Sequence, residues 1–236
     1  FSPSLEFLSS GPLLPRSRKA ELLARLSSVE EATFTAWRVY PRNYVEYFTR
    51  DWYSRYSSGR HASYGTQLRS VTFKPQMEGG KQEVRTVPLD ELLQGQTTGL
   101  FVIEGKTGDN DKRNRRRVIL TDIGLGVVQD RASILVWALS LADGTPLADC
   151  QISIYTDKNL PIGSARTDRN GTALITHGSL PKGEAPYLVT ARLGDDASML
   201  LLDGSGDHNQ VPFALKGRPY PKHAYEAFVY TERGIC

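Results

Sequence analysis

Residues 151–176 read QISIYTDKNLPIGSARTDRNGTALIT, and their spacing indicates the fold class. Residues 151–155 alternate between polar and apolar side chains, as in a strand with one buried face. Residues 163–167 and 172–176 are two more strand candidates, with Asp168-Arg169-Asn170-Gly171 between them. Because Asn and Gly tolerate positive φ, this tetrapeptide predicts a hairpin between those two strands.

The same pattern continues on both sides of this stretch. Further strand candidates are residues 123–128, 133–139, 187–193 and 198–202, the last two flanking a turn at Gly194-Asp195-Asp196. The run 133–139 is apolar on both faces, which is typical of a central sandwich strand. Counted from Ile123, the seven strands recur about every 8–12 residues, which predicts an immunoglobulin-like sandwich.

The first half of the chain also favours strands. Residues 32–39 alternate with a wobble at Trp37, and residues 21–26 read as a preceding strand that pairs with them through Ser27-Ser28. Residues 88–93 form a single helical turn with Pro88 near its start. The remaining strand candidates are residues 71–74, 84–87 and 100–104.

Two stretches interrupt this pattern. Tyr44, Phe48, Trp52 and Tyr56 recur every four residues, which predicts a short helix that packs or caps the core; stacking on single-stranded nucleic acid is the alternative. Residues 108–117 hold five basic and no apolar side chains. They predict a solvated loop or linker, where trypsin would cut first, and the alternative is a phosphate-binding patch.

We therefore predict an all-β chain of tandem immunoglobulin- or fibronectin-like antiparallel sandwiches. The first spans residues 1–120 and the second residues 121–203, while residues 204–236 form a linker and the first strand of a following domain. The chain opens Phe1-Ser2-Pro3 without a signal sequence, so we expect a piece of a larger protein and draw nothing from the missing targeting signal.

Composition limits the partners. Lys and Arg total 29 against 26 Asp and Glu, and this small excess argues against a nucleic-acid binder. The longest apolar run, residues 134–139, is far shorter than the ~18 residues of a membrane span, so we expect no membrane insertion by these residues. Cys150 and Cys236 lack zinc or redox spacing; we expect Cys150 to be buried and Cys236 to be incidental.

The search for chemistry finds no catalytic, cofactor-binding or metal-ligating constellation. Turns at Asp157-Lys158-Asn159 and at Asp168 begin like calcium loops but lack the later acidic ligands. Asp195 and Asp196 are neighbours in a turn, so we expect their carboxylates to point apart. The histidines lie far apart along the chain: His61, His177, His208 and His223. We therefore expect no enzyme and no cofactor.

Several motifs in order carry a resemblance. They are TDIGL (121–125), ILVWA (134–138), LADGTPLAD (141–149), TDRNGTA (167–173) and AFVYTERGI (227–235). This order resembles bacterial alpha-2-macroglobulins, whose macroglobulin-like domains begin with such segments. Residues 12–15, 29–32 and 99–104 resemble the preceding domain more weakly. Cys236 departs from the family, which usually has Tyr there.

The resemblance implies scaffold domains of a broad-spectrum endopeptidase inhibitor in the periplasm or cell envelope. Such a protein traps proteases after bait cleavage and protects the envelope, so the implied partners are proteases and neighbouring macroglobulin domains. The family's Cys-x-Glu-Gln thioester motif is missing from these residues, because Cys150-Gln151 are adjacent. The alternatives are an immunoglobulin-like adhesin or stalk module that binds a surface ligand, and an accessory sandwich of a carbohydrate-active enzyme.

Overall fold

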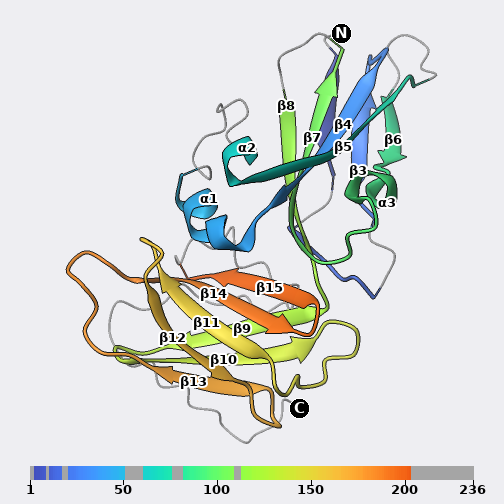
Figure 1. Cartoon of the computed structure of the whole chain (residues 1–236). Helices are drawn as coiled ribbons and strands as arrows, with labels where there is room; N and C mark the ends of the chain where they lie inside the picture. Colours follow the sequence, from blue (N-terminus) through green and yellow to red (C-terminus); the bar gives the residue numbers. More distant parts are fainter. Residues whose placement is uncertain are drawn as a thin grey trace, which may run out of the picture.

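Two β-sandwiches follow one another along the chain (Figure 1). The computed structural model describes residues 3–8, 11–17, 21–50, 61–75, 82–108 and 113–202. Strands dominate both units and the helices are short, so the predicted all-β class is confirmed. The linker and strand expected at residues 204–236, with Cys236, lie outside the described residues.

The first sandwich packs a three-stranded sheet (β1-β3-β6) against a five-stranded sheet (β2-β8-β7-β4-β5). All strand pairs are antiparallel except β2 with β8, which run parallel. The strands are β1 (Ser4–Phe7), β2 (Leu13–Leu14), β3 (Leu23–Ser27), β4 (Ala32–Val39), β5 (Gly65–Phe73), β6 (Gln82–Thr86), β7 (Gly99–Thr107) and β8 (Arg113–Leu120). The helices are η1 (Pro41–Asn43), α1 (Tyr44–Arg50), α2 (His61–Tyr64) and α3 (Leu89–Leu93).

The alternation of β4 explains its place in this core. Ala32, Phe34 and Ala36 are fully buried between the two sheets. Pairing with β5 shifts register between Thr35 and Trp37, which is the wobble expected from the sequence. The helical turn expected at residues 88–93 is also confirmed, as α3.

The pairing expected across Ser27-Ser28 is wrong. The strand β3 pairs with β1 and β6, and β4 belongs to the opposite sheet. Ser28 adopts a φ of 53°, and the chain crosses from one sheet to the other instead of turning back on itself. This crossing lets Leu26 of β3 and Phe34 of β4 bury their side chains in the same core.

The basic run is a strand, so the predicted loop over residues 108–117 is wrong from Arg113 onward. The strand β8 pairs with β7, and Glu104 of β7 accepts hydrogen bonds from Arg113 and Arg115, each at 3.0 Å. On the opposite face of β8, Arg116 donates to the Gly11 carbonyl at 2.6 Å. From Arg113 onward the arginines therefore have partners within the chain, which disfavours a phosphate-binding patch there. First cleavage by trypsin at these residues stays a prediction.

The second sandwich contains the seven expected strands in sheets of three (β13-β10-β9) and four (β12-β11-β14-β15). Its core takes side chains from both sheets, among them the fully buried Ile134, Ile152 and Val189. The strands are β9 (Ile123–Gln129), β10 (Ser133–Ser140), β11 (Gln151–Thr156), β12 (Pro161–Arg166), β13 (Thr172–Thr176), β14 (Pro186–Leu193) and β15 (Asp196–Leu201).

Of the two expected hairpins in this unit, one forms. The strands β14 and β15 pair around Gly194-Asp195, as predicted. The turn at residues 168–171 also forms, because the Asp168 carboxylate accepts from the backbone N–H groups of Asn170 and Thr172, both at 2.9 Å. However, β12 and β13 lie in different sheets, so this turn joins the two layers and the predicted hairpin is wrong.

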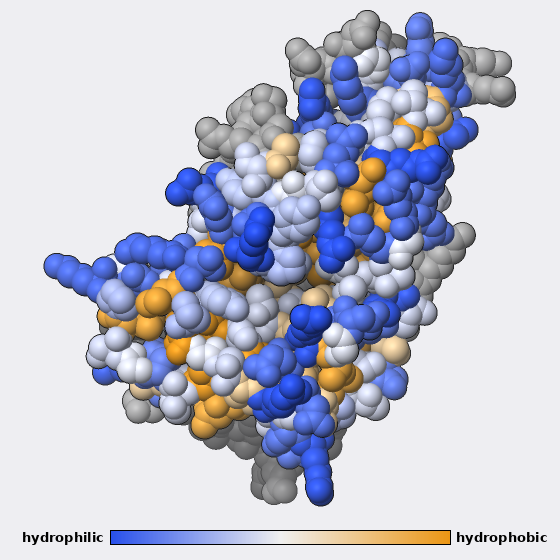
Figure 2. All heavy atoms as spheres, in the orientation of Figure 1, coloured by the Kyte–Doolittle hydropathy of each residue, from blue (hydrophilic) through white to orange (hydrophobic). Residues whose placement is uncertain are grey.

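The strand β10 is central in its sheet, as predicted, but its outer face is open to solvent. Leu135 pairs across the sheet with Val128 of β9 and Leu174 of β13, and these side chains are 37%, 51% and 61% exposed. We call these residues the outer apolar row. Figure 2 shows hydrophobic side chains (orange) on the surface of this lower unit and in the waist between the units.

Cys150 lies in the core of the second sandwich with no exposed surface, as expected from the sequence. Burial raises the pKa of its thiol to about 11. At neutral pH the group is therefore a protonated, packed side chain rather than a nucleophile.

Candidate functional site

The two sandwiches meet at a junction that combines a buried linker, an apolar cluster and a polar network. Only Thr121 and Asp122 separate β8 of the first unit from β9 of the second. Thr121 is fully buried, and its hydroxyl accepts a hydrogen bond from the Ile123 N–H at 3.0 Å. Such a short and buried connection brings the end of one sandwich directly onto the next.

An apolar cluster spans the junction. Leu188 of β14 and Met199 and Leu201 of β15 pack into one buried cluster with side chains of α1, β7 and β8. The aromatic stripe contributes Tyr44 and Phe48, so its predicted packing role is confirmed for these two residues. Burial raises the pKa of the Tyr44 hydroxyl. Trp52 and Tyr56 lie outside the described residues.

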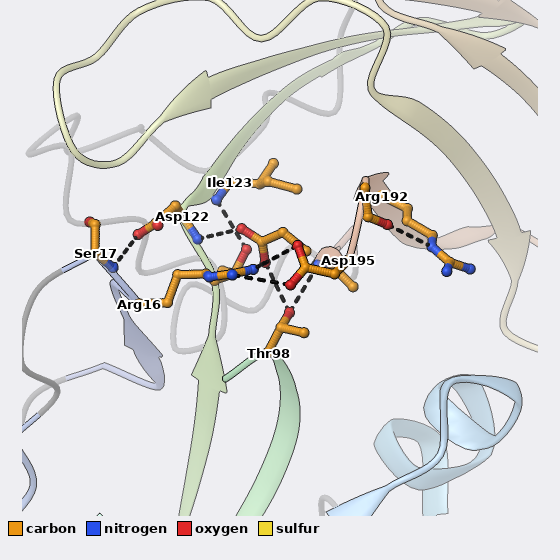
Figure 3. A network of polar contacts seen from close by, with 11 residues as sticks. Arg16, Ser17, Thr98, Asp122, Ile123, Arg192 and Asp195 are labelled. Atoms are coloured by element: carbon orange, nitrogen blue, oxygen red, sulfur yellow. Dashed lines mark hydrogen bonds and ion pairs between the residues drawn. The ribbon is translucent and has the colours of Figure 1, made fainter. Parts of the chain in front are cut away.

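A buried carboxylate organises the polar part of the junction (Figure 3). Asp196, the first residue of β15, is 8% exposed. One of its oxygens accepts from the Thr98 hydroxyl at 2.9 Å, and the other accepts from the Asp122 N–H at 2.8 Å. The Thr98 hydroxyl in turn accepts from the Ala197 N–H at 3.0 Å. The first sandwich, the linker and the second sandwich are thus joined through one side chain.

The positive charge at the junction is the guanidinium of Arg16, which lies between β2 and β3 in the sequence. Arg16 donates to both carboxylate oxygens of Asp195, at 3.3 and 3.1 Å, and lies 3.9 Å from Asp196. The hydrogen bond from Arg16 and its charge lower the pKa of Asp195, and the same hydrogen bond raises the pKa of Arg16. The expectation that the two carboxylates point apart is therefore wrong, because both approach one guanidinium.

The sequence does not point to Arg16, Thr98 or Asp122 as partners of this turn. Arg16 and Asp195 are separated by 179 positions, so no local spacing connects them. The available signal is the adjacent pair Asp195-Asp196 in a predicted turn, and adjacency alone leads to the expectation that the two carboxylates share no partner. Its hydrogen bonds show a structural carboxylate pair instead.

The other side chains considered for chemistry stay apart. The His177 Nδ1 lies 2.9 Å from the Gly178 carbonyl, and its buried Nε2 has no hydrogen-bond partner among the described residues. Asp157 accepts from the Ala185 N–H at 3.3 Å. The side chain of His61 and the whole of His208 and His223 lie outside what the structure describes.

Within the described ranges, no three His, Cys, Asp or Glu side chains gather closely enough to hold a metal ion. Nor does any helix in this part of the chain have the length and apolar character needed to cross a membrane.

Comparison with known families and structures gives a consistent result. Residues 120–220 match the family described as bacterial alpha-2-macroglobulin MG3 domain. No curated protein matches the sequence significantly.

Solved structures share the two-sandwich fold. Native alpha-2-macroglobulin from Escherichia coli spanning domains NIE-MG1 is 21% identical with a TM-score of 0.68, over 85% of this chain and 97% of that one. Trypsin-activated alpha-2-macroglobulin from E. coli is 18% identical with a TM-score of 0.67, over 85% of this chain and 14% of that one. The Salmonella alpha-2-macroglobulin mutant Y1175G is 19% identical with a TM-score of 0.61, over 86% of this chain and 12% of that one. The chain therefore spans a small part of the longer relatives.

Proposed function

We propose that this chain is a macroglobulin-like fragment of a bacterial alpha-2-macroglobulin and a non-enzymatic scaffold of such a protein. The family match of residues 120–220 and the shared two-sandwich fold support this proposal. In this proposal the full-length protein is a broad-spectrum inhibitor that traps endopeptidases after they cleave a bait segment. The bonded junction is the observation that carries the proposal. It joins two sandwiches by buried apolar contact and by the Asp196 hydrogen bonds, as a part that must hold its neighbours in place requires.

The proposal includes the domain limits, the partners and the location. The first sandwich spans residues 1–120 and the second residues 121–203, with residues 204–236 leading to a further domain. The passage from β8 to β9 at Thr121 supports the first limit. Neighbouring macroglobulin domains and, through the full-length protein, proteases are the partners. The E. coli protein that spans domains MG0-NIE-MG1 supports a further domain beside these two. The proposed location is the bacterial periplasm or cell envelope.

The physical role of the fragment is geometric. Interfaces between domains of one chain usually permit motion unless they are large and apolar. Here the apolar cluster excludes water and the buried Asp196 adds directional hydrogen bonds, so the two sandwiches transmit a displacement together. A trap that closes after bait cleavage needs such rigid parts, because closure depends on where each domain is carried.

A protection assay tests this function. Trypsin incubated with the full-length protein is expected to lose activity on a large protein substrate while it keeps activity on a small peptide substrate. The isolated chain of 236 residues is expected to protect neither substrate, because a fragment cannot enclose a protease. Equal cleavage of the large substrate with and without the full-length protein would contradict the proposal, and protection by the isolated chain would contradict the scaffold role.

A further inference from the structure

We propose that residues 11–17 are an interdomain splint that fixes the angle between the two sandwiches, and that Arg16 is its positioning residue. The inference rests on contacts within this chain and does not depend on the protease-trapping function. The splint precedes β3 in sequence, yet it lies beside the junction that closes after β8 (Figure 3).

The splint is attached to the first sandwich along the edge of β8. Its β2 residues pair in parallel with Ile119 and Leu120. The Ile119 N–H donates to the Pro12 carbonyl at 2.7 Å, and Arg116 donates to the Gly11 carbonyl at 2.6 Å. These bonds fix the segment to the last residues of β8, immediately before the linker.

The same segment is attached to the linker and to the second sandwich. The Thr121 N–H donates to the Leu14 carbonyl at 3.2 Å, and the Ser17 N–H donates to the Asp122 carboxylate at 2.8 Å. Arg16 then makes its two hydrogen bonds to Asp195 in the β14–β15 turn. Both linker residues, Thr121 and Asp122, are therefore hydrogen-bonded to the splint.

Directional bonds are needed here because apolar contact alone does not define an angle. Hydrophobic burial depends on area and is non-directional, so the apolar cluster stabilises contact between the sandwiches over a range of orientations. Hydrogen bonds weaken steeply when their geometry is distorted. The bidentate contact between Arg16 and Asp195 is the contact by which the splint reaches the second sandwich, so it constrains the orientation of that sandwich directly.

The charge pattern separates this positioning role from a role in stability. Asp195 has a side chain that is 76% exposed, and exposed ion pairs contribute little to unfolding free energy. Loss of the pair should therefore broaden the distribution of interdomain angles while it leaves the melting temperature nearly unchanged. A residue that merely stabilised the fold would show the opposite pattern.

Spin labels report the angle directly. In a Cys236→Ser background, labels at Glu30→Cys in the first sandwich and Lys182→Cys in the second lie at exposed positions, and Cys150 is buried from the reagent. Pulsed electron–electron double resonance, which measures the distance between the two labels, should give one narrow distance distribution for the parent protein. The Arg16→Ala variant keeps the apolar cluster and the Asp196 hydrogen bonds but loses the contact of the splint with the second sandwich, so it is expected to widen the distribution by about twofold or more.

Matched variants make the test decisive. Arg25→Ala removes an exposed ion pair with Glu6, 3.1 Å long, within the first sandwich, and should leave the distance distribution unchanged. Arg16→Lys keeps the charge but loses the two-pronged geometry, so its distribution should have an intermediate width. Asp195→Asn provides the same test from the other partner if Arg16→Ala fails to fold. A distribution as narrow as that of the parent protein in both Arg16→Ala and Asp195→Asn would overturn the proposal, as would equal broadening in Arg25→Ala.

Discussion

At the residue scale, Gly171 shows how one position fixes the passage between two sheets. It has a φ of 72° in the turn from β12 to β13. A Cβ on this residue would lie 2.5 Å from the Ala138 carbonyl oxygen of β10, which is backbone and cannot rotate away. The position therefore needs glycine both for its backbone conformation and for the close approach of a neighbouring strand.

We expect Gly171→Ala to destabilise the protein more than Gly183→Ala does. Gly183 has a similar φ of 79°, but a Cβ added there would meet no atom within 4 Å, so its substitution carries only the conformational cost of about 1–2 kcal/mol. The clash at Gly171 should add about 1–3 kcal/mol. Urea denaturation of both variants measures the difference, and equal midpoints would show that β10 yields to the added methyl group.

Asp195 gives the junction an acid-sensitive contact. Arg16 lowers the pKa of this carboxyl below its usual value, so its contribution is present above the ordinary aspartate pKa of about 3.9 and is lost as pH falls through the lowered value. Arg16 is the charged group that acts on Asp195, and the charges of Asp196 and Asp122 act in turn on Arg16. The labelled protein should therefore keep its narrow interdomain distance distribution at about pH 4, and the distribution should broaden only at lower pH, where the Asp195 carboxyl becomes protonated.

Asp195→Asn is the control for this pH dependence. Its distribution should already be broad at neutral pH and should not broaden further in the acid range before the sandwiches unfold. An acid transition of the same size in this variant would place the responsible group elsewhere.

At the element scale, local pattern predicts strands better than it predicts their partners. The alternation of β4, β11 and β13 is visible in sequence because buried residues alternate with residues that are half-buried or exposed. The crossings at Ser28 and at Gly171 are not visible, since a tight turn looks the same whether the next strand returns to its own sheet or joins the facing one.

The strand β8 shows a second limit of local pattern. Its arginines read as a solvated loop because their partner Glu104 and the β7 backbone are contributed from elsewhere in the chain. The apolar residues Val118, Ile119 and Leu120 at the end of the strand were the local indication of burial. The charge pairing that makes a basic strand tolerable depends on tertiary contact, which a single sequence does not display.

The two faces of β13 should respond differently to the same substitution. Leu174, in the outer apolar row, is 61% exposed, whereas its neighbour Ile175 is 4% exposed in the core. Leu174→Thr should change the unfolding free energy by no more than about 0.5 kcal/mol. Ile175→Thr buries a hydroxyl and removes apolar volume, so it should cost about 2 kcal/mol or more.

Thermal denaturation followed by circular dichroism measures both β13 variants. A large loss of thermal stability in Leu174→Thr would mean that the outer apolar row packs against another part of the protein. In that case the row belongs to the core of a larger unit rather than to its surface.

At the scale of the whole molecule, the sequence predicts two sandwiches and an absence of converging catalytic groups, but it does not predict how the sandwiches meet. The aromatic stripe gave a partial indication, since Tyr44 and Phe48 pack at the junction. The polar partners come from the splint, from Thr98 and from the β14–β15 turn, which are distant in sequence. Contacts between such segments follow from topology, which local periodicity leaves open.

The position of Arg16 in the chain also has a consequence for biosynthesis. Its acceptor Asp195 is translated 179 residues later, which takes about 9–36 s at 5–20 residues per second. During that interval the first sandwich can fold on the ribosome before the Asp195 carboxylate that binds Arg16 has been synthesised. The hydrogen bonds between Arg16 and Asp195 can therefore form only after the β14–β15 turn has been synthesised, so this contact between the sandwiches is a late one.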